Sequence, residues 1–460
     1  MSPRTGVESS AQLAPRDHDV SVPRNVSRVH DGNPRAKTLR LTVRLGGRDV
    51  DLELERNDDL FAPDYREQGG HSPGDRCHYR GFVVQNAHSS SSRAGGGPSP
   101  GSYASVSACA EGLRGFVYLG HTPRASVDAD EPPEHDPQRL FVLEPARLVP
   151  REHSSDARRD PLSMEVVTYL APTHSSTEHA ETDERFGGTI GNEEPPSEAV
   201  GSFRRGLRGS SSKPPPKTPP SFPRPLLTYR VLIVHDKARC DSKKAGASIS
   251  DAEKDAMYVE ILEWFNGAQD PFKTLTEYSN VDLQVVIAGQ MDWCDGNQPY
   301  ALNAGEKFQF LEDIPGKISD WVSANRDALP RHHLVFIATA ADMVLGEDDI
   351  GGYAHSYSAC HSGSTVVVAE TLGYSVLAGV GLTLHEVGHT FGFGHDMYDY
   401  GLTACKNQDT IMATWLDGVP IKPSRFFSTC CKSLFREHYL NGRVQVPRDD
   451  PLVRVRERRA

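Results

Sequence analysis

The chain has 460 residues and a formal net charge of −12, with 33 prolines and 40 glycines. Its length would suit about three average domains, but so much proline and glycine indicates that part of it is not packed core. Acidic residues are spread along the chain and the longest apolar run is broken by glycines, so we expect neither a nucleic-acid binder nor a membrane span.

The first third of the chain predicts a small β-rich domain. Residues 1–35 look disordered, and because they lack the apolar core of a secretory signal, either the protein is intracellular or the recorded start is incomplete. Apolar residues then alternate on both sides of Gly46 and Gly47, which predicts a hairpin over residues 39–54. Further strand signals follow at residues 79–84, 115–119 and 140–143. We place this domain at residues 36–170.

A linker is predicted for residues 171–225, which are rich in Glu, Ser, Gly and especially Pro and cannot form a packed core. Arg205 and Arg208 lie within it at the spacing that a furin-like convertase minimally accepts. They are therefore either a processing site or simply two arginines in a loop.

From residue 228 onward the sequence alternates between strand and helix signals. Strands are predicted at residues 229–234, 281–287 and 333–338, and helices at residues 251–265 and 306–323. Residues 350–357 and 365–369 would supply the remaining strands. This order predicts a largely parallel sheet with helices on its faces. We place this domain at residues 226–442 and expect a disordered basic tail over residues 443–460.

Cysteine usage is compatible with disulfides. None of the eight cysteines forms the CxxC pairs of a structural zinc site, and an even number permits complete pairing. Spacing alone does not give the connectivity. The candidates are Cys77, Cys109, Cys240, Cys294, Cys360, Cys405, Cys430 and Cys431.

The chemistry is concentrated in residues 384–396, LHEVGHTFGFGHD. On a helix, His385 and His389 are one turn apart and face the same way, so both imidazoles can bind one Zn²⁺. Glu386 is not placed as a ligand and can act as general base on the attacking water. The sequence therefore predicts one catalytic zinc ion.

A third ligand follows after a turn. Gly392 tolerates the left-handed conformation that ends a helix, so the chain can turn back and present His395 to the metal. Three histidines leave one zinc position open, the arrangement that separates catalytic from structural sites. Met412 lies 17 residues beyond His395, where metzincins carry a tight turn whose methionine is under the metal. Read alone, Met412 would be an ordinary core residue.

These residues resemble the reprolysin, or adamalysin and ADAM/ADAMTS, branch of the metzincins, because Asp396 follows the third histidine. Residues 77–119 resemble the propeptide of that family and residues 427–435 its closing helix. The resemblance implies a twisted, mostly parallel five-stranded sheet, an active-site helix over about residues 374–391 and an irregular lower subdomain after Gly392. It also implies a substrate cleft whose rim strand is near residues 351–357, where an extended substrate could add as an antiparallel strand.

The same resemblance implies export and a set of disulfides. A secreted zymogen is expected, although no signal peptide is visible. The implied pairs are Cys77 with Cys109, Cys360 with Cys430, and Cys405 with Cys431. The last two pairs could be crossed. Cys240 with Cys294 then remains. Similar short enzymes occur among secreted arthropod proteins, including those of tick saliva.

Two departures from the family are visible. No cysteine lies between Cys109 and Cys240, so the propeptide cysteine that keeps many relatives latent is missing, and no cysteine-rich module follows residue 440. The family's calcium site also looks lost. Aligning its strand with this chain places Arg230 where relatives carry an acidic residue six positions before Asp236, and His333 replaces a second acid, so we expect no bound calcium.

We therefore predict a monomeric zinc metalloendopeptidase, a hydrolase that cleaves peptide bonds in extracellular proteins. Its partners would be protein or peptide substrates, with no nucleic acid. The alternative is a metalloprotease-fold binding or decoy protein without turnover, which usually has lost the glutamate or a ligand. A structural protein with incidental zinc would normally supply four ligands. Surface or hydrogen-bonding roles are predicted for the histidines outside the motif, namely His332, His333, His355 and His361.

Overall fold

A computed structural model describes eighteen segments of the chain, and the account below is restricted to them. They are residues 18–21, 24–28, 37–67, 77–84, 102–109, 112–119, 139–145, 166–170, 224–279, 281–301, 308–309, 313–345, 348–355, 358–359, 365–371, 376–395, 411–412 and 427–440. The chain divides into two compact units, of which Met1–Pro172 with Pro225–Arg456 is the larger. The predicted linker, apart from residues 224–225, and the predicted basic tail lie outside the described residues.

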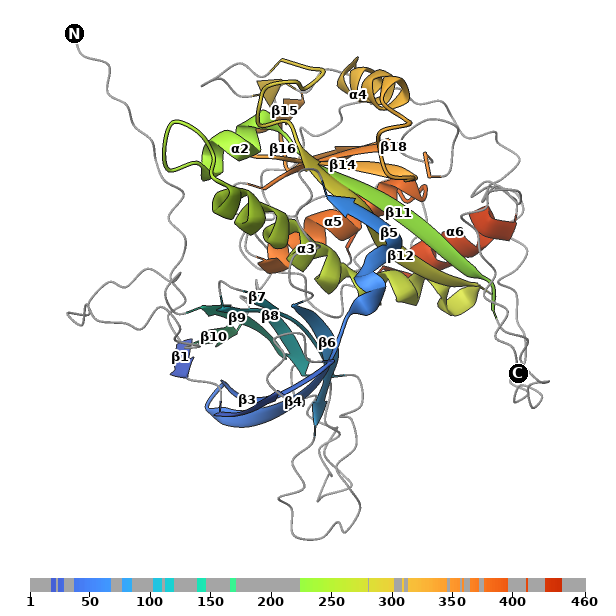
Figure 1. The fold of residues 1–460 in the computed structure, drawn as a ribbon. Helices are drawn as coiled ribbons and strands as arrows, with labels where there is room; N and C mark the ends of the chain where they lie inside the picture. Colours follow the sequence, from blue (N-terminus) through green and yellow to red (C-terminus); the bar gives the residue numbers. More distant parts are fainter. Residues whose placement is uncertain are drawn as a thin grey trace, which may run out of the picture. The chain divides into compact units, whose positions relative to one another are not determined.

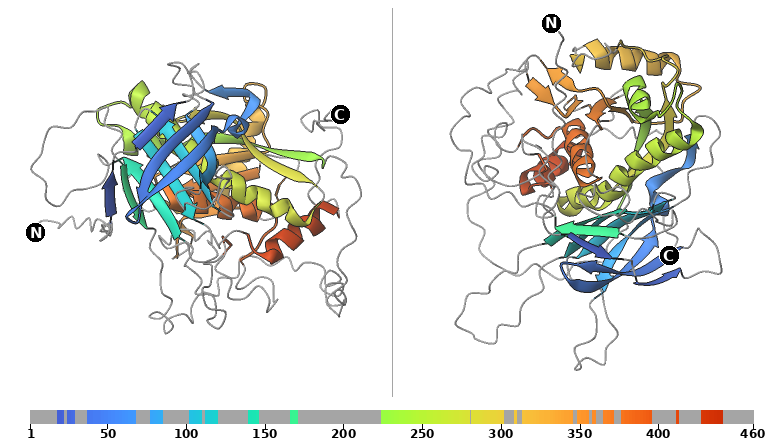
Figure 2. Two further views of the ribbon diagram at one scale, coloured as in Figure 1. Left: turned by 90° about the horizontal axis from the view of Figure 1, so that it is seen from below. Right: turned by 90° about the vertical axis from the view of Figure 1, so that its left-hand side faces the viewer.

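The N-terminal region forms one antiparallel sheet of nine strands in the order β1-β10-β9-β8-β7-β6-β4-β3-β2 (Figures 1 and 2). Leu39, Leu41, Val43 and Leu45 are buried at alternate positions of β3, as period-two alternation predicts for a half-buried strand. The predicted hairpin is formed by β3 and β4, with both turn glycines at positive φ. The strands are β1 (His18–Ser21), β2 (Arg24–Arg28), β3 (Thr38–Leu45), β4 (Arg48–Arg56), β6 (His78–Val84), β7 (Tyr103–Cys109), β8 (Gly112–Leu119), β9 (Arg139–Pro145) and β10 (Val166–Leu170).

The prediction that residues 1–35 are disordered is wrong for the two strands β1 and β2. β1 pairs antiparallel with β10, and β2 pairs antiparallel with β3. β1 is too short to be recognised by its own periodicity, and it pairs with a strand that lies almost 150 residues further along the chain. Backbone pairing to a distant strand, rather than local sequence, creates this edge of the sheet.

The C-terminal region contains a six-stranded sheet in the order β17-β18-β14-β11-β12-β5. β11, β12, β14 and β18 run parallel to their neighbours, and β17 is antiparallel at one edge. The predicted α/β class with a mostly parallel sheet is confirmed, and five of the six strands come from the region where we expected them. The strands are β11 (Leu226–His235), β12 (Asp282–Asp292), β14 (Leu334–Thr339), β17 (Gly352–Ala354) and β18 (Thr365–Glu370).

The sixth strand, β5 (Phe61–Glu67), was not predicted and comes from the N-terminal region. It follows the short helix η1 (Asp58–Leu60) and pairs parallel with β12 at the edge of the sheet. Its sequence, FAPDYRE, is polar and contains a proline, which is tolerated on an edge strand because one side of the backbone has no partner strand. Such a strand gives no periodic signal.

Helices cover both faces of this sheet (Figure 1). Val231 and Ile233 of β11 belong to the hydrophobic cluster that contains α3 and α5, whereas Leu232 and Val234 face a second cluster with α4. Strand residues therefore alternate between two buried faces, as a covered parallel sheet requires. The helices are α2 (Lys237–Lys243), α3 (Asp251–Thr274), α4 (Asp313–Ala324), α5 (Val376–Thr390) and α6 (Thr429–Leu440), with the short helix η3 (Leu275–Tyr278). A small third sheet contains β13 (Phe308–Gln309), β15 (Met343–Leu345) and β16 (Asp348–Ile350).

Local signals set some helix boundaries and contradict one prediction. α3 begins at a capping box in which the Ser250 and Glu253 side chains each accept a hydrogen bond from the other residue's backbone. The helix predicted over residues 306–323 begins only at Asp313, and Phe308–Gln309 is a strand. Pro315 explains the difference, because proline is tolerated in a first helical turn but its ring clashes with the carbonyl four residues earlier.

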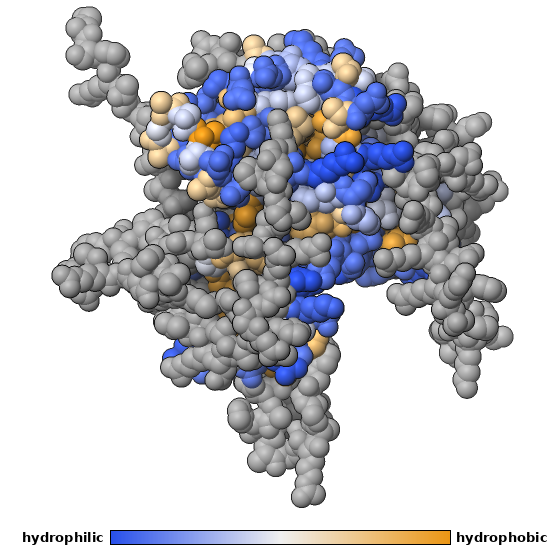
Figure 3. Space-filling model, in the orientation of Figure 1, coloured by the Kyte–Doolittle hydropathy of each residue, from blue (hydrophilic) through white to orange (hydrophobic). Residues whose placement is uncertain are grey.

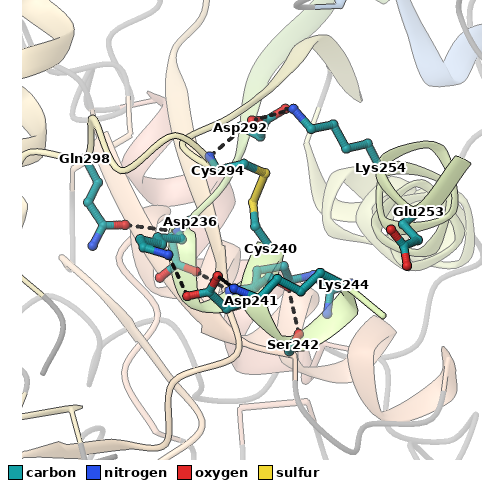
Figure 4. Close-up of a disulfide and its surroundings, with 12 residues drawn as sticks. Asp236, Cys240, Asp241, Ser242, Lys244, Glu253, Lys254, Asp292, Cys294 and Gln298 are labelled. Atoms are coloured by element: carbon teal, nitrogen blue, oxygen red, sulfur yellow. Dashed lines mark hydrogen bonds and ion pairs between the residues drawn. A yellow bond between two sulfur atoms is a disulfide. The ribbon is translucent and has the colours of Figure 1, made fainter. Parts of the chain in front are cut away.

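Two disulfides lie within the described residues, and each joins residues of one region only. Cys77 pairs with Cys109 in the N-terminal sheet, and Cys240 of α2 pairs with Cys294 after β12 (Figure 4). The first is a pair that the family resemblance implies, and the second is the pair that then remained. Cys430 is also disulfide-bonded, while Cys360 and Cys405 lie outside the described residues. Cys431 is fully buried, and its sulfur accepts a hydrogen bond from Ser428.

The described surface exposes few large hydrophobic side chains. Figure 3 shows mainly hydrophilic residues with scattered hydrophobic ones. Among the described residues, Tyr278 is the one large hydrophobic side chain that is exposed. No described helix is both long and apolar enough to cross a bilayer.

A buried histidine in the N-terminal sheet predicts a pH-dependent stability. The Nδ1 atom of His78 lies 2.7 Å from Ser107 Oγ, and its Nε2 atom is buried without a hydrogen-bond partner. Burial lowers the pKa of His78 from 6.5 to about 3. The unfolded chain therefore takes up this proton first, and stability falls as the pH drops below about 6.5.

We expect the wild-type chain to lose about 2 kcal/mol more unfolding free energy than His78→Asn between pH 7 and pH 5. Asparagine keeps a polar atom near Ser107 but cannot take up the proton. Urea unfolding of both proteins at the two pH values measures the difference, to which the other titrating groups contribute equally. Parallel losses in the two proteins would contradict the assignment.

Candidate metal centre

The candidate site is built on the C-terminal half of helix α5. The helix is apolar nearly all round, and every residue from Val376 to Thr390 is buried except Ala378 and His389. It ends where Gly392 adopts a positive φ of 88°. The backbone N–H of Phe393 then reaches back to the Gly388 carbonyl at 3.3 Å. This left-handed turn reverses the chain and brings residues 393–395 back beside the helix, as predicted.

Two backbone carbonyls fix how the first two histidines are protonated. His385 Nδ1 lies 2.7 Å from the Ile411 carbonyl oxygen, and His389 Nδ1 lies 2.7 Å from the Phe393 carbonyl oxygen. A carbonyl can only accept, so each Nδ1 atom must carry the proton and donate it. Each Nε2 atom is then left with a lone pair, which is the form of imidazole that binds a metal.

These lone pairs converge. The Nε2 atoms of His385 and His389 are 3.1 Å apart, and one ring nitrogen of His395 lies within 4.8 Å of both. Two unprotonated nitrogens at this distance repel each other unless a cation lies between them. The donor set of three neutral imidazoles is one that zinc accepts in catalytic sites. The residues present therefore fit the ion that the sequence predicts.

Burial keeps the His385 imidazole in this state. The pKa of His385 is held well below its usual value, first by burial and then by the neighbouring His389 and His395 rings. A ligand histidine must be neutral, so this environment favours metal binding over protonation.

Glu386 lies on the same helix beneath the edge strand of the sheet. It is 4% exposed, and burial raises the pKa of its carboxyl to about 8. A nearby dication would oppose this rise by favouring the carboxylate. A Cβ atom placed on Gly352 of β17 would lie 2.4 Å from Glu386 Oε1. The edge strand can therefore pass this close to the carboxylate only because residue 352 has no side chain.

Met412 and helix α6 pack against the segments that carry the histidines. A Cβ atom on Gly388 would lie 2.7 Å from the Met412 sulfur, so that methionine packs directly against the helix between the two ligands. His438 of α6 lies with Nδ1 3.1 Å from the Phe391 carbonyl oxygen, and the Phe435 ring packs edge-on against the Phe391 ring. These contacts hold the turn that carries the third histidine.

The structure brings together most of the residues singled out from the sequence. The three histidines, Glu386, Gly392 and Met412 lie together at the C-terminal end of α5, while Asp396 lies outside the described residues. His332 and His333 hydrogen-bond to backbone atoms of Pro330 and Arg230, as the predicted structural role requires. His355 is exposed, and His361 lies outside the described residues.

Sequence reasoning missed three features of the site. The carbonyls of Ile411 and Phe393 have no signal in a sequence, because every residue has one. Gly352 lies inside the predicted rim strand. A glycine in an edge strand could have indicated that another group approaches the backbone closely there. The supporting role of His438 had no motif to mark it.

Two family models match the chain. One, described as Metallo-peptidase family M12B Reprolysin-like, matches residues 272–396 and so includes the three histidines and Glu386. The other, described as Reprolysin family propeptide, matches residues 4–84.

One curated protein and two solved structures are similar to the chain. The chain is 22% identical over 459 residues to "Zinc metalloproteinase-disintegrin-like atrase-A" of Naja atra, covering 95% of this chain and 61% of that protein. It therefore spans less than two thirds of that relative. Metalloproteinase-II from Bacteroides fragilis has a TM-score of 0.41 at 11% identity, covering 87% of this chain and 91% of its own. Archaemetzincin from Methanopyrus kandleri has a TM-score of 0.27 at 15% identity, covering 46% and 96%. Structural likeness at these scores supports no argument.

Proposed function

We propose that this chain, which belongs to the reprolysin (M12B) family of zinc metallopeptidases and carries that family's propeptide, is an endopeptidase that cleaves extracellular proteins. The observation that carries the proposal is the convergence of three imidazole nitrogens beside a buried glutamate of helix α5. His385, His389 and His395 would hold one zinc ion, and Glu386 would be the general base.

The chemistry divides between the ion and the chain. Bound zinc would supply Lewis-acid polarisation of the scissile carbonyl and would make a water molecule more acidic. Glu386 would take the proton of the attacking water and return it to the leaving amine. Ile411 and Phe393 keep His385 and His389 in the binding tautomer through their carbonyls.

Substrate would bind along the edge of the sheet. β17 is an edge strand whose antiparallel neighbour is β18, so one side of its backbone lacks a partner strand in the described sheet. An extended peptide added there would place a peptide bond near Glu386, since Gly352 passes beside that carboxylate. The decoy reading has less support, because the glutamate and all three histidines are present.

Cleavage of a proteome-derived peptide library by the purified protein, with and without a zinc chelator, tests the activity. We expect chelator-sensitive cleavage at internal peptide bonds. An extracellular site of action is proposed from the family and from the disulfides. Absence of cleavage by a zinc-loaded, processed protein would favour the decoy function.

We also expect maturation by cleavage after Arg208, because this residue lies in the proline-rich linker between the two folded regions. The mature protein would begin at Gly209. N-terminal analysis of secreted material tests this, and a mature start within residues 228–240 would rule it out.

We further propose that the catalytic region binds no calcium. Arg230, which replaces a family acid, is buried and forms an ion pair with Asp64 at 2.6 Å, and its backbone N–H donates to His333 Nδ1 at 3.0 Å. Calcium prefers six to eight oxygen ligands, and a guanidinium at this position repels the ion. We expect the melting temperature to be unchanged by a calcium-selective chelator at constant zinc. A clear drop would contradict the proposal.

A further inference from the structure

We infer that the propeptide stays bound to the catalytic domain as a noncovalent subunit after the linker is cut, held by strand β5 and by one face of helix α3. The inference rests on the proposed function only for the cut in the linker. The contacts that carry it are independent of catalysis.

Strand β5 makes the propeptide part of the catalytic sheet. Phe61, Arg66 and Glu67 pair with β12, so this segment extends the sheet by one strand. Two glutamine side chains of β12 reinforce the pairing. Gln284 Nε2 donates to the Asp59 carbonyl at 3.2 Å, and Gln290 Nε2 donates to the Tyr65 hydroxyl at 3.2 Å. If the propeptide left, the edge of β12 would lose backbone and side-chain partners together.

An ion pair fixes the middle of this strand. Asp64 Oδ1 accepts a hydrogen bond from Arg230 Nη2 at 2.6 Å, and Arg230 Nε donates to the Arg331 carbonyl at 2.7 Å. The Arg230 side chain is only 6% exposed, whereas Asp64 is 52% exposed. The buried partner is therefore on the catalytic domain, and the propeptide supplies the carboxylate that pairs with it.

The second contact is the propeptide face of α3, which consists of Glu263, Asn266, Gly267 and Asp270. These residues are spaced at i, i+3, i+4 and i+7, so they lie on one side of the helix. All nine residues from 261 to 269 are buried, so this stretch of α3 is covered on every side. The catalytic sheet and α5 cover two sides, and the propeptide covers the side formed by this face.

Polar groups of both regions meet across that face. Asn266 Oδ1 accepts from Asn57 Nδ2 at 2.8 Å, while Asn266 Nδ2 donates to the Tyr79 carbonyl at 3.1 Å and to Ser105 Oγ at 2.9 Å. Glu263 faces Arg114 at 3.5 Å. Asp270 faces Arg80 at 3.7 Å. All these partners of the α3 side chains belong to the propeptide.

Apolar packing adds to these polar contacts. Leu60, Phe116 and Tyr118 of the propeptide belong to the same buried cluster as the core of the catalytic domain. A Cβ atom on Gly267 would lie 2.9 Å from the Phe116 ring, so the glycine allows that ring to approach the helix. A polar face around a small apolar contact is typical of interfaces between proteins that are also stable apart.

No disulfide joins the two regions. Cys77 and Cys109 are the only cysteines before residue 225, and they pair with each other. The two parts are thus connected by the linker alone, and their association after cleavage depends on the contacts described above.

The test uses the full chain with a site for a sequence-specific protease inserted near residue 215, in a Glu386→Ala background that prevents self-digestion. After complete cleavage, gel filtration and native mass spectrometry at micromolar concentration report whether the fragments separate. We expect one species containing both fragments. Two separate species in native buffer would overturn the inference.

Variants assign the contacts. We expect Asp64→Ala and Asn266→Ala each to raise the dissociation constant of the cleaved pair on the order of 10-fold, because each leaves a buried polar group without its partner. Lys237→Ala is the matched control, since it removes an ion pair with Asp241 that lies within the catalytic domain. Its dissociation constant should equal that of the parent.

Separate measurements distinguish a change in the interface from misfolding and from loss of catalysis. The melting temperature of each uncleaved variant shows whether it folds, and a variant that fails is replaced by Asp64→Asn or Asn266→Asp. Equal dissociation constants for all variants and the control would overturn the assignment of the interface. Peptide cleavage by the chain without the Glu386→Ala change is measured separately, so failure of the proposed enzyme function would be seen independently.

Discussion

Replacing Glu386 by alanine is expected to leave the zinc content unchanged and to lower peptide cleavage by at least about 100-fold. The three histidines would hold the ion, and the tautomers of His385 and His389 depend on the carbonyls of Ile411 and Phe393, which this change does not touch. Glu386 makes no hydrogen bond to any of the histidines in the described residues. Metal analysis of the purified variant, together with initial rates on one fluorogenic peptide, measures both quantities.

Two further variants make the result specific. His385→Ala should lose both zinc and activity, since one ligand and its hydrogen bond disappear. Glu277→Ala is the control for a glutamate elsewhere, because Glu277 is 51% exposed and pairs with Lys432 on the surface. Its rate should stay within about twofold of wild type. Undiminished cleavage by zinc-loaded Glu386→Ala protein would refute the general-base role.

The zinc site was predictable because its information is local. Two ligands and the base lie within five consecutive positions of one helix, and Gly392 marks the turn that returns the third histidine. Helical geometry alone then brings the imidazoles together. The Ile411 carbonyl comes from a segment more than 20 residues away and has no side-chain signature, so no motif could reveal it.

The fold was predictable where apolar residues mark the buried strands along the chain. Strands β11, β12, β14 and β18 are nearly continuous apolar runs, and residues 229–234, 281–287, 333–338 and 365–369 had been assigned to them. β5 and β1 were missed because short polar strands acquire their conformation from a distant partner rather than from their own sequence. The late start of α4 at Asp313 could have been inferred, since Pro315 was visible.

The propeptide shows the same contrast between features that local sequence marks and contacts that it does not. Its β-rich character follows from alternating residues such as Leu39 and Leu41, but its contact with the catalytic domain depends on Asp64 and Asn57, which look like ordinary loop residues. Arg230 was read from the sequence as the loss of a calcium ligand. Its ion pair with Asp64 gives that substitution a positive role in holding the propeptide.

The packing of α5 against α3 predicts the second large effect, a loss of stability in Gly379→Ala. A Cβ atom at this position would lie 1.9 Å from Trp264 Cε2, and the Trp264 side chain is completely buried. The indole has no free space to move into, so the two helices must separate. We expect a loss of about 3 kcal/mol, or roughly 6–12 °C in melting temperature.

Gly316→Ala is the matched control, because it is the same exchange in helix α4 at a position with no atom within 4 Å of the new Cβ. Alanine there removes backbone freedom from the unfolded chain without a clash, so stability should rise by about 0.5–1 kcal/mol. Thermal unfolding of both variants at constant zinc gives two shifts of opposite sign. Because α5 carries His385 and His389, zinc affinity should fall in Gly379→Ala and stay unchanged in Gly316→Ala. Similar melting temperatures for the two variants would show that the helices can adjust around Trp264, and that the position of α5 does not depend on this contact.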